Sequence, residues 1–302
     1  FSIERYILHI CRRLYMIKKL NSYKNSYFHR IQEKKGAILH VSKNTIIIDL
    51  DDTLFTTFKR KWLAFKHMEK QFSIPLNLNA KKVANSFGFE DYIKKYSPKS
   101  FENIPEKTKE NMKNEWFNHF ISEATFKIHL ENNNNKKFKS FSKEIVDYLL
   151  QEQERTKNLS KFISNLVGFN IIYLSGRPQS LYEASVEELK LNNFPLPNGS
   201  TIRLQLKNKD QSDLESKHEI IACLDLNSIF CIFEDNEEII QDILNIYKQQ
   251  NKRPPWIYRN IPPYRNYLTL GDNVYSDLAE FTKVVEKEIE NFSVRKKRSK
   301  IK

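Results

Sequence analysis

The hydrophobic pattern alternates between short apolar runs and longer stretches in which apolar residues recur at helical spacing. Runs typical of strands buried on both faces lie at Thr45–Ile48, Phe169–Leu174 and Ser228–Phe233. Further strands are predicted near Ile202–Leu206 and at Trp256–Tyr258. Strands separated by helical stretches predict an α/β fold, which we expect to be a Rossmann-like three-layer core with a parallel sheet.

Helical periodicity fills the long interval between the first two strands, from Phe58 to about Lys157. Its apolar positions fall in two groups, Trp62, Phe65, Met68 and Phe72 on one helix face and Trp116, Phe117, Phe120 and Ile121 on another. Asn- and Ser-rich segments at 77–79, 97–99 and 132–137 predict loops. A helical stretch of this length between two core strands predicts an inserted domain.

The remaining periodic segments predict the helices of the core. They cover Asn158–Val167, Leu181–Asn192, Asp213–Leu224, Glu237–Gln250 and Leu278–Phe292. We therefore divide the chain into a basic N-terminal helical arm (1–44), a core (45–57 and 158–294), a helical insertion (58–157) and a basic tail (295–302). The tail is expected to be disordered because it is almost entirely cationic.

The arm has a helical pattern of its own over residues 1–35. Its apolar positions are Tyr6, Ile7, Ile10, Leu14, Ile17 and Leu20. The pattern predicts either an extra helix packed on the core or an arm that binds RNA, a membrane surface or a partner protein. The chain begins at Phe1 rather than Met, which is consistent with a fragment or a processed form.

Composition places the chain among ordinary globular proteins. Of 302 residues 40% are hydrophobic, and 6 Gly and 10 Pro are too few for a fibrous or low-complexity chain. The three cysteines (Cys11, Cys223 and Cys231) are odd in number and lack metal-site spacing, so we expect reduced thiols in a cytoplasmic compartment. No apolar run approaches the roughly 18 residues of a membrane span.

The net charge of +13 is unevenly distributed. Residues 1–44 carry +8, residues 55–168 carry +8 and the tail carries +6, so the rest of the chain has an excess of acid. An acidic region flanked by basic ones suits a site that binds a divalent cation and receives an anionic substrate. The basic insertion and ends are either an ordinary solvated surface or a surface for nucleic acid.

Candidate chemistry begins where the first strand ends, in the run T-I-I-I-D-L-D-D-T-L from Thr45 to Leu54. Asp49, Asp51 and Asp52 fall within four residues. Carboxylates so close raise one another's pKa and cost stability, unless a cation or phosphate chemistry uses them. The carboxyl ends of the strands are also where ligands bind in open α/β sheets.

Two further strand ends carry polar residues. The strand at Phe169–Leu174 leads into Ser175-Gly176-Arg177, where a hydroxyl and accessible backbone N–H groups could bind a phosphate oxygen. The strand at Ser228–Phe233 ends in the acids Glu234 and Asp235, and the preceding helix carries Lys217.

Taken in order, these elements resemble the four signatures of the haloacid dehalogenase (HAD) superfamily of phosphotransferases. The resemblance covers roughly Ile46–Asn236 and implies a magnesium-dependent phosphohydrolase with a helical cap of the C1 type. It makes Asp49 the nucleophile that forms an aspartyl-phosphate and Asp51 the general acid and base. Ser175 and Lys217 would complete the catalytic set by binding the phosphoryl group.

The resemblance also implies binding residues. Mg²⁺ would be held by Asp49, Asp51, Glu234 and Asp235, with Thr53, Gly176 and Arg177 against the substrate. Two departures from the family pattern are Asp52, where Gly is common and which could alter the metal or flap geometry, and Glu234, where a second Asp or a Gly is usual. The second Asp of the first signature argues against dehalogenation.

Several alternatives stay open. The segment from Gly271 to Asp277 is a second candidate for the metal motif or, instead, a turn with Ser276 and Asp277 capping the following helix. Lys207 and Lys209 compete with Lys217, and Arg177 could either bind phosphate or anchor the next helix.

The substrate is expected to be a phosphomonoester, either a small metabolite or the phosphate end of a nucleic acid. The alternative from another class is a non-catalytic basic scaffold, or an RNA-binding component, built on a HAD-like core. We see no RNA-recognition motif that supports it directly.

Overall fold

In the computed structural model, the described residues are 44–96, 99–131, 141–166, 168–208, 211–261 and 272–299. The predictions for the N-terminal arm, for the loop at 132–137 and for Lys209 and Gly271 fall outside these ranges. None of the helices in the described part is both long enough and apolar enough to cross a membrane.

Six parallel strands form one sheet in the order β3-β2-β1-β4-β5-β6. Their bounds are β1 Thr45–Ile48, β2 Asn170–Pro178, β3 Ile202–Lys207, β4 Ile229–Phe233, β5 Trp256–Tyr258 and β6 Val274–Tyr275. The five predicted strands are present, although β2 runs four residues past its predicted end and β6 was not predicted. This strand order is that of the doubly wound dinucleotide-binding folds.

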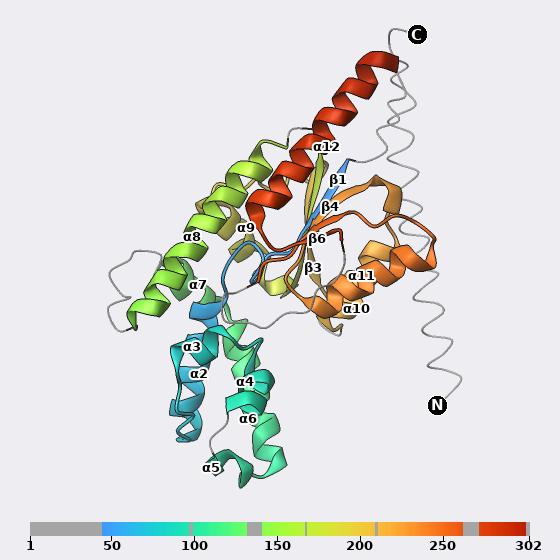
Figure 1. The fold of residues 1–302 in the computed structure, drawn as a ribbon. Helices are drawn as coiled ribbons and strands as arrows, with labels where there is room; N and C mark the ends of the chain where they lie inside the picture. Colours follow the sequence, from blue (N-terminus) through green and yellow to red (C-terminus); the bar gives the residue numbers. More distant parts are fainter. Residues whose placement is uncertain are drawn as a thin grey trace, which may run out of the picture. The chain divides into compact units, whose positions relative to one another are not determined.

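Helices cover both faces of the sheet (Figure 1). The core helices are α9 Tyr182–Leu191, α10 Asp213–Ala222, α11 Glu237–Gln249 and α12 Leu278–Ser299, together with the C-terminal half of α8 Lys143–Ser164. Single turns of 3-10 helix lie at Gln179–Leu181 and Leu226–Ser228. The predicted disorder of the tail is wrong for 295–299, which continue α12, while 300–302 lie outside the described ranges.

Alternate residues of the central strand enter the two hydrophobic layers. Ile46 and Ile48 pack with residues of α8, α9 and α12, including Phe162, Leu189 and Phe281. Ile47 packs instead with residues of α10 and α11, including Ile221 and Ile243. Because a strand points successive side chains to opposite faces, the apolar run of β1 serves both layers. The predicted three-layer α/β class is confirmed.

The helices between β1 and α8 gather beyond one end of the strands (Figure 1). They are α2 Phe58–Phe72, α3 Ala80–Ala84, α4 Phe89–Tyr96, α5 Lys99–Glu102, α6 Glu106–Phe120 and α7 Glu123–Glu131. We call α2 to α7 the helical segment. Its own hydrophobic cluster includes Phe65, Met68, Tyr92 and Trp116.

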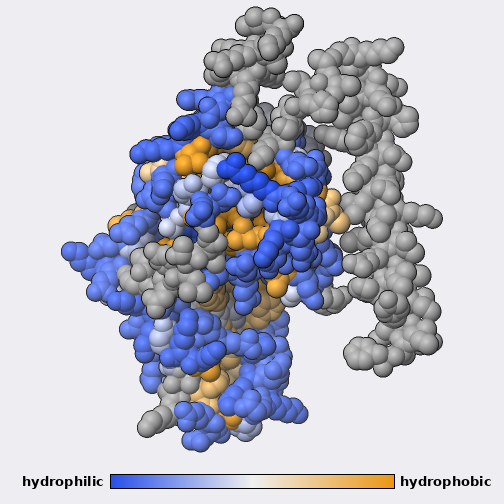
Figure 2. Space-filling model, turned by 45° about the vertical axis from the view of Figure 1, so that its right-hand side comes forward, coloured by the Kyte–Doolittle hydropathy of each residue, from blue (hydrophilic) through white to orange (hydrophobic). Residues whose placement is uncertain are grey.

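One helix joins this cluster to the core. The N-terminal half of α8 places Ile145 and Leu149 in the cluster of the helical segment, and its C-terminal half places Leu159 and Ile163 in the core. The helix predicted to begin at Asn158 therefore begins at Lys143 instead. Residues 151–158 are all polar, but the buried Glu152 and Thr156 continue the inward face of the helix through this stretch, so the helix runs across the predicted boundary. In Figure 2 most of the surface is hydrophilic, with apolar side chains showing in patches among polar ones.

Candidate active site

The carboxyl ends of three neighbouring strands carry the candidate residues. β1 lies between β2 and β4, with Ile48 in register with Tyr173 of β2 and with Phe233 of β4. Asp49 directly follows β1 and Glu234 directly follows β4, while Ser175 lies on the extended end of β2. Parallel pairing therefore brings together residues that are up to 185 positions apart in the chain.

Asp49 is a buried carboxylate paired with a buried lysine. Its side chain is 5% exposed, and Lys217 donates from Nζ to its Oδ1 at 2.8 Å. The same Nζ donates to Glu234 Oε2 at 2.9 Å. Burial, together with Glu234 and Asp235, raises the pKa of Asp49 well above its ordinary value, although Lys217 opposes that shift. Burial would lower the pKa of Lys217, but Asp49 and Glu234 raise it, so Lys217 stays charged.

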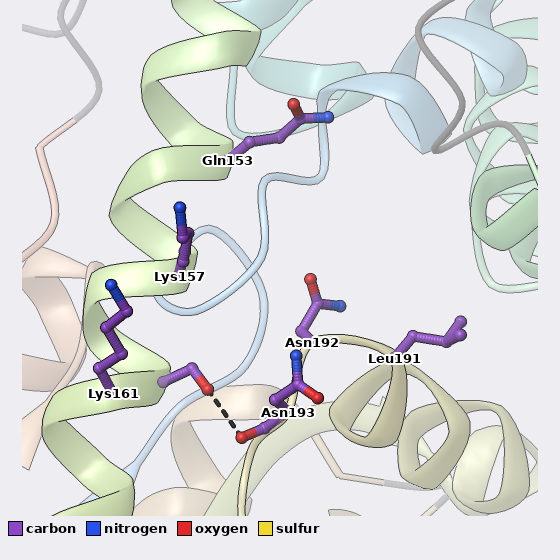
Figure 3. Close-up of a pocket in the computed structure, with 7 residues that line it drawn as sticks. Gln153, Lys157, Lys161, Leu191, Asn192 and Asn193 are labelled. Carbon is purple, nitrogen blue, oxygen red and sulfur yellow. Dashed lines mark hydrogen bonds between the residues drawn. The ribbon is translucent and has the colours of Figure 1, made fainter.

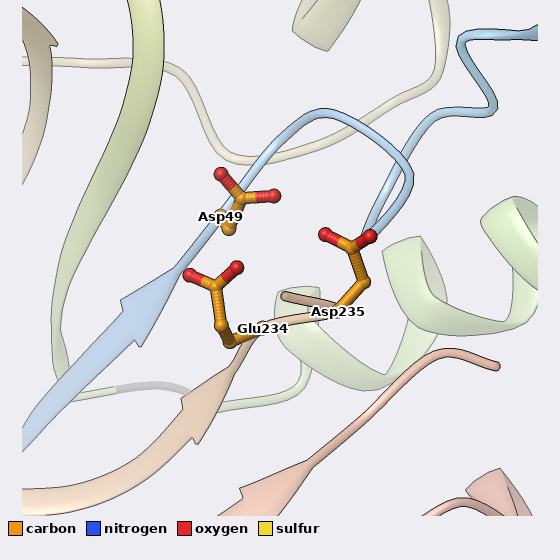
Figure 4. A group of neighbouring side chains, drawn as sticks. All are labelled: Asp49, Glu234 and Asp235. Atoms are coloured by element: carbon orange, nitrogen blue, oxygen red, sulfur yellow. The ribbon is translucent and has the colours of Figure 1, made fainter. Parts of the chain in front are cut away.

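Three acids converge at this point (Figure 4). Ligand oxygens of Asp49, Glu234 and Asp235 lie within 4.8 Å of one another, and all three residues are buried. Burial first, and then Asp235 and Asp213, raise the pKa of Glu234 to about 7 against the opposing effect of Lys217. Crowding with Asp51 and Asp52 was the predicted cause of a raised pKa at Asp49, but burial is the largest cause and the acids that contribute are Glu234, Asp235 and Asp213.

Asp235 is fixed by the turn that follows the nucleophile candidate. Thr53, which is fully buried, donates from Oγ1 to Asp235 Oδ1 at 3.2 Å. The carbonyl of Thr53 accepts a hydrogen bond from Arg155 on α8, and Thr156 Oγ1 donates to the carbonyl of Leu54 at 2.7 Å. Thr53 thus positions an acid in this structure, whereas the sequence predicted a substrate contact.

Ser175 and Gly176 lie beside the N-terminus of α10. Ser175 is 2% exposed, and the backbone N–H of Arg177 donates to its Oγ at 3.4 Å. A Cβ added to Gly176 would lie 2.4 Å from Oδ1 of Asp213, so the close approach of that carboxylate requires glycine here. Asp213 Oδ2 is 3.7 Å from Lys217 Nζ, which adds a third acid near the ammonium group, after Asp49 and Glu234.

Asp51 has a very different environment from Asp49. Arg177 donates to it from Nε at 3.1 Å and from Nη2 at 2.6 Å, and Arg60 on α2 donates to the same carboxylate. Burial alone would raise the pKa of Asp51, but Arg177 and Arg60 overcome that effect and lower it to about 2. The expectation of a raised pKa at Asp51 is therefore wrong, because two guanidinium groups outweigh the neighbouring acid.

Arg177 makes the contacts expected of an anchor for the next helix, one of its two predicted roles. Its Nη1 donates to Ser185 Oγ at 3.0 Å and its Nη2 to Glu188 Oε2 at 2.7 Å, both on α9. With Asp51 as a third partner, the guanidinium group is held on several sides. The carboxylate of Asp51, predicted as a metal ligand, lies outside the cluster of three acids.

Asp52 has a local structural role. Its φ of +59° lies in the left-handed region, which explains why glycine suits the position. Its carboxylate accepts from the backbone N–H of Thr57 at 2.8 Å, from Thr57 Oγ1 at 2.6 Å and from Lys61 Nζ at 2.7 Å. These bonds offset the backbone strain and fix the start of α2, so this departure from the family pattern anchors the helical segment.

The rival metal motif does not converge on the site. Asp272 and Asp277 are exposed. Among the described residues, neither belongs to the group formed by Asp49, Glu234 and Asp235. Asp277 Oδ1 accepts from the backbone N–H of Glu280 at 2.8 Å, which caps α12 as the alternative interpretation predicted. Of the rival lysines, Lys207 lies over the ring of Phe117 at 5.6 Å.

Two charged residues near the site were missed by the sequence analysis. Asp213 lies four residues before Lys217, so helical spacing could have placed both on one face. Arg60 lies four residues before the buried Ala64 and eight before Met68, which is again one helix face. It was overlooked because it is flanked by Lys59 and Lys61 in a run that suggests a solvated surface.

A separate cavity of about 270 Å³ lies between α8 and the end of α9 (Figure 3). It is lined by Gln153, Lys157, Ser160, Lys161, Leu191, Asn192 and Asn193. Ser160 Oγ donates to the carbonyl of Asn193 at 2.7 Å across its floor. None of the residues predicted for the site lines this cavity.

Comparison with solved structures gives matches of low sequence identity. No protein-family model and no curated protein matches the sequence. A haloacid dehalogenase-like family hydrolase from Streptococcus pneumoniae aligns at 11% identity and a TM-score of 0.40, with 80% of this chain and 90% of that chain covered. A haloacid dehalogenase-like family hydrolase from Xanthomonas campestris aligns at 10% and 0.37, with coverages of 81% and 98%. Function is therefore inferred from the side chains at the strand ends.

Proposed function

We propose that this protein is a magnesium-dependent phosphomonoester hydrolase of the HAD type that works through an aspartyl-phosphate on Asp49. The observation that carries the proposal is the pairing of Asp49 with Lys217 inside a group of three buried acids at adjacent strand ends. A carboxylate nucleophile beside a fixed ammonium group suits transfer of a phosphoryl group, whose negative charge must be stabilised.

The donor set fits a divalent cation. Once ionised around a cation, Asp49, Glu234 and Asp235 would supply three negative charges in a buried space, and Lys217 supplies one positive charge. The remaining charge of minus two matches Mg²⁺, which prefers oxygen ligands and needs only a few from the protein. When bound there, Mg²⁺ would neutralise the acids and the phosphate oxygens, so that the two anions can approach each other.

The protein's own residues then divide the work. Asp49 attacks phosphorus while the bond to the leaving oxygen breaks, and Lys217 stabilises charge on the phosphoryl oxygens. Ser175 Oγ, from the neighbouring strand, could donate to one of those oxygens. Hydrolysis of the aspartyl-phosphate by water releases phosphate and restores Asp49. We assign the proton transfers to Asp51, which follows Asp49 by two residues.

Asp51 needs a change of partners to perform that role. A carboxylate held by Arg60 and Arg177 is a poor proton donor, since both guanidinium groups stabilise its charged form. The proposed catalytic state therefore differs from the described one in the contacts between α2 and the turn after β1.

Magnesium-dependent hydrolysis of p-nitrophenyl phosphate tests the proposal. We expect turnover with Mg²⁺ and none with excess chelator. In Asp49→Asn we expect no phosphate to be attached to the protein in an acid-stable form. Asp272→Asn is the matched control, because it removes an exposed aspartate outside the cluster. Equal turnover in the wild type and in Asp49→Asn would contradict the covalent mechanism, and the non-catalytic scaffold would then be the better interpretation.

A further inference from the structure

Arg60 is buried without enough partners. Its side chain is 1% exposed, and among the described residues its Nε and Nη1 have no hydrogen-bond partner. Only Nη2 is paired, with Asp51. Buried N–H groups normally find an acceptor, so two unpaired donors on one guanidinium group indicate that a ligand supplies it.

Aromatic rings cover the faces of the Arg60 guanidinium group and not its in-plane donors. The guanidinium group lies over the rings of Phe120 at 4.7 Å and Phe126 at 4.4 Å. Arg177 lies over Phe126 as well, at 4.6 Å. Aromatic rings take the face of a guanidinium group and leave its in-plane donors free. A carboxylate or phosphate binds those in-plane donors in pairs.

The two arginines on Asp51 differ in how they are held. Arg177 has partners on α9, namely Ser185 and Glu188, in addition to Asp51. Arg60 belongs to α2 of the helical segment, and among the described residues its guanidinium group donates a hydrogen bond to Asp51 alone. Arg60 is therefore the one that can exchange Asp51 for a ligand without dismantling the core.

We propose that Arg60 binds a second anionic group on the leaving group of the substrate, so that the preferred substrates are phosphomonoesters that also carry a carboxylate or another phosphate. This proposal rests on the proposed function and names its substrate class. The side chain of Asp51, which Arg60 contacts, is 26% exposed, whereas those of Asp49 and Glu234 are 5% and 4% exposed. Solvent thus reaches the site beside Arg60, on the side where a proton donor would meet the leaving oxygen.

Three esters that share one carbon chain test the proposal with Mg²⁺ present: propyl phosphate, 3-phosphonooxypropanoate and propane-1,3-diyl bisphosphate. We expect kcat/KM for at least one of the latter two to exceed that for propyl phosphate by about tenfold or more. A preference for one of them identifies carboxylate or phosphate as the second group. In Arg60→Met the preference should fall to within about threefold, because the apolar stem remains and the charge is lost.

Two further variants make the result specific. Lys70→Met removes the same charge from an exposed position of α2 and should keep the wild-type preference. Arg60→Lys should retain an intermediate preference, because an ammonium group keeps the charge but not the paired donors. If circular dichroism shows that Arg60→Met does not fold, Arg60→Lys replaces it in the test.

The outcomes separate the two proposals. If the wild type hydrolyses all three esters equally, Arg60 does not select the substrate and the phosphatase proposal stands. If no ester is hydrolysed, the phosphatase proposal fails, and thermal stabilisation by the same compounds decides the binding proposal. A larger rise in melting temperature with the doubly anionic compounds, lost in Arg60→Met, supports the proposal that Arg60 binds a second anion. Equal rises with all three compounds, or no rise, in the wild type overturn it.

Discussion

Asp49 and Asp51 come from one short motif, yet their carboxylates have opposite environments. Asp49 is surrounded by acids and held by one lysine, and its pKa is raised. Asp51 is held by two arginines, and its pKa is lowered. We call the first environment the acid cluster (Asp49, Glu234, Asp235 and Lys217) and the second the arginine pair (Arg60 and Arg177 on Asp51).

The difference has a topological origin. The residues of the acid cluster belong to the core, on the ends of β1 and β4 and on α10. The arginine pair takes one member from β2 and the other from the helical segment. The core thus holds the residues of the proposed cation and phosphoryl site on its own, whereas the contacts of Asp51 include Arg60 on α2. Chemistry at Asp49 and access at Asp51 are therefore set by different parts of the molecule.

The largest expected effect comes from a substitution within the acid cluster. Asp49→Asn should lower kcat/KM for p-nitrophenyl phosphate by at least about a thousandfold, because an amide is not a nucleophile for phosphorus. The melting temperature should stay level or rise, since the variant removes one of several crowded acids. Steady-state kinetics and thermal denaturation measure the two parts. Retention of more than a few per cent of the activity would contradict the assigned role of Asp49.

Breaking the arginine pair should have the opposite effect on stability. Asp51→Asn leaves two buried guanidinium groups without their shared carboxylate, which should cost about 3 kcal/mol, less than for a fully buried pair because Asp51 is 26% exposed. Urea denaturation gives the free energy of unfolding. If Asp51→Asn were as stable as the wild type, the two ion pairs would contribute little, and the contrast with Asp49 would lose its energetic basis.

The sequence was informative where chemistry follows a buried strand. β1, β2 and β4 were predicted from apolar runs, and the residues after them, such as Asp49 and Glu234, are adjacent because parallel pairing dictates it. The pKa of Asp51 could not be predicted in the same way. It depends on Arg60, whose contact with the turn after β1 is set by the packing of the helical segment and not by any local spacing.

Local patterns also failed where an element serves two regions. α8 carries apolar residues for the helical segment in one half and for the core in the other, and the polar residues 151–158 between them suggested a helix boundary that the structure does not have. The short strand β6 has only the partly buried Val274 and Tyr275, and two residues give no recognisable strand pattern. Its parallel pairing with β5 in the structure is what identifies it as a strand.

Metal binding offers a way to sharpen the comparison. Millimolar Mg²⁺ should stabilise the protein by about 2 kcal/mol if it binds the acid cluster and not the unfolded chain. Asp235→Asn should lose most of the corresponding thermal shift, and Asp272→Asn should keep it. Differential scanning fluorimetry across a Mg²⁺ series measures both. The reverse order would move the metal motif to the segment before α12.

The smallest expected effect concerns the border of the acid cluster, where Gly176 meets Asp213. Gly176→Ala should cost about 1–2 kcal/mol, because the new Cβ would lie 2.4 Å from the carboxylate of Asp213, which must swing away. The side chain of Asp213 is 40% exposed, so it has solvent to move into, and that limits the cost. Asp213→Ala on the Gly176→Ala background should recover most of the loss, and a double-mutant cycle from urea denaturation gives the coupling between the two positions. A coupling near zero would mean that Asp213 does not press on Gly176, and the acid cluster would then end at Lys217.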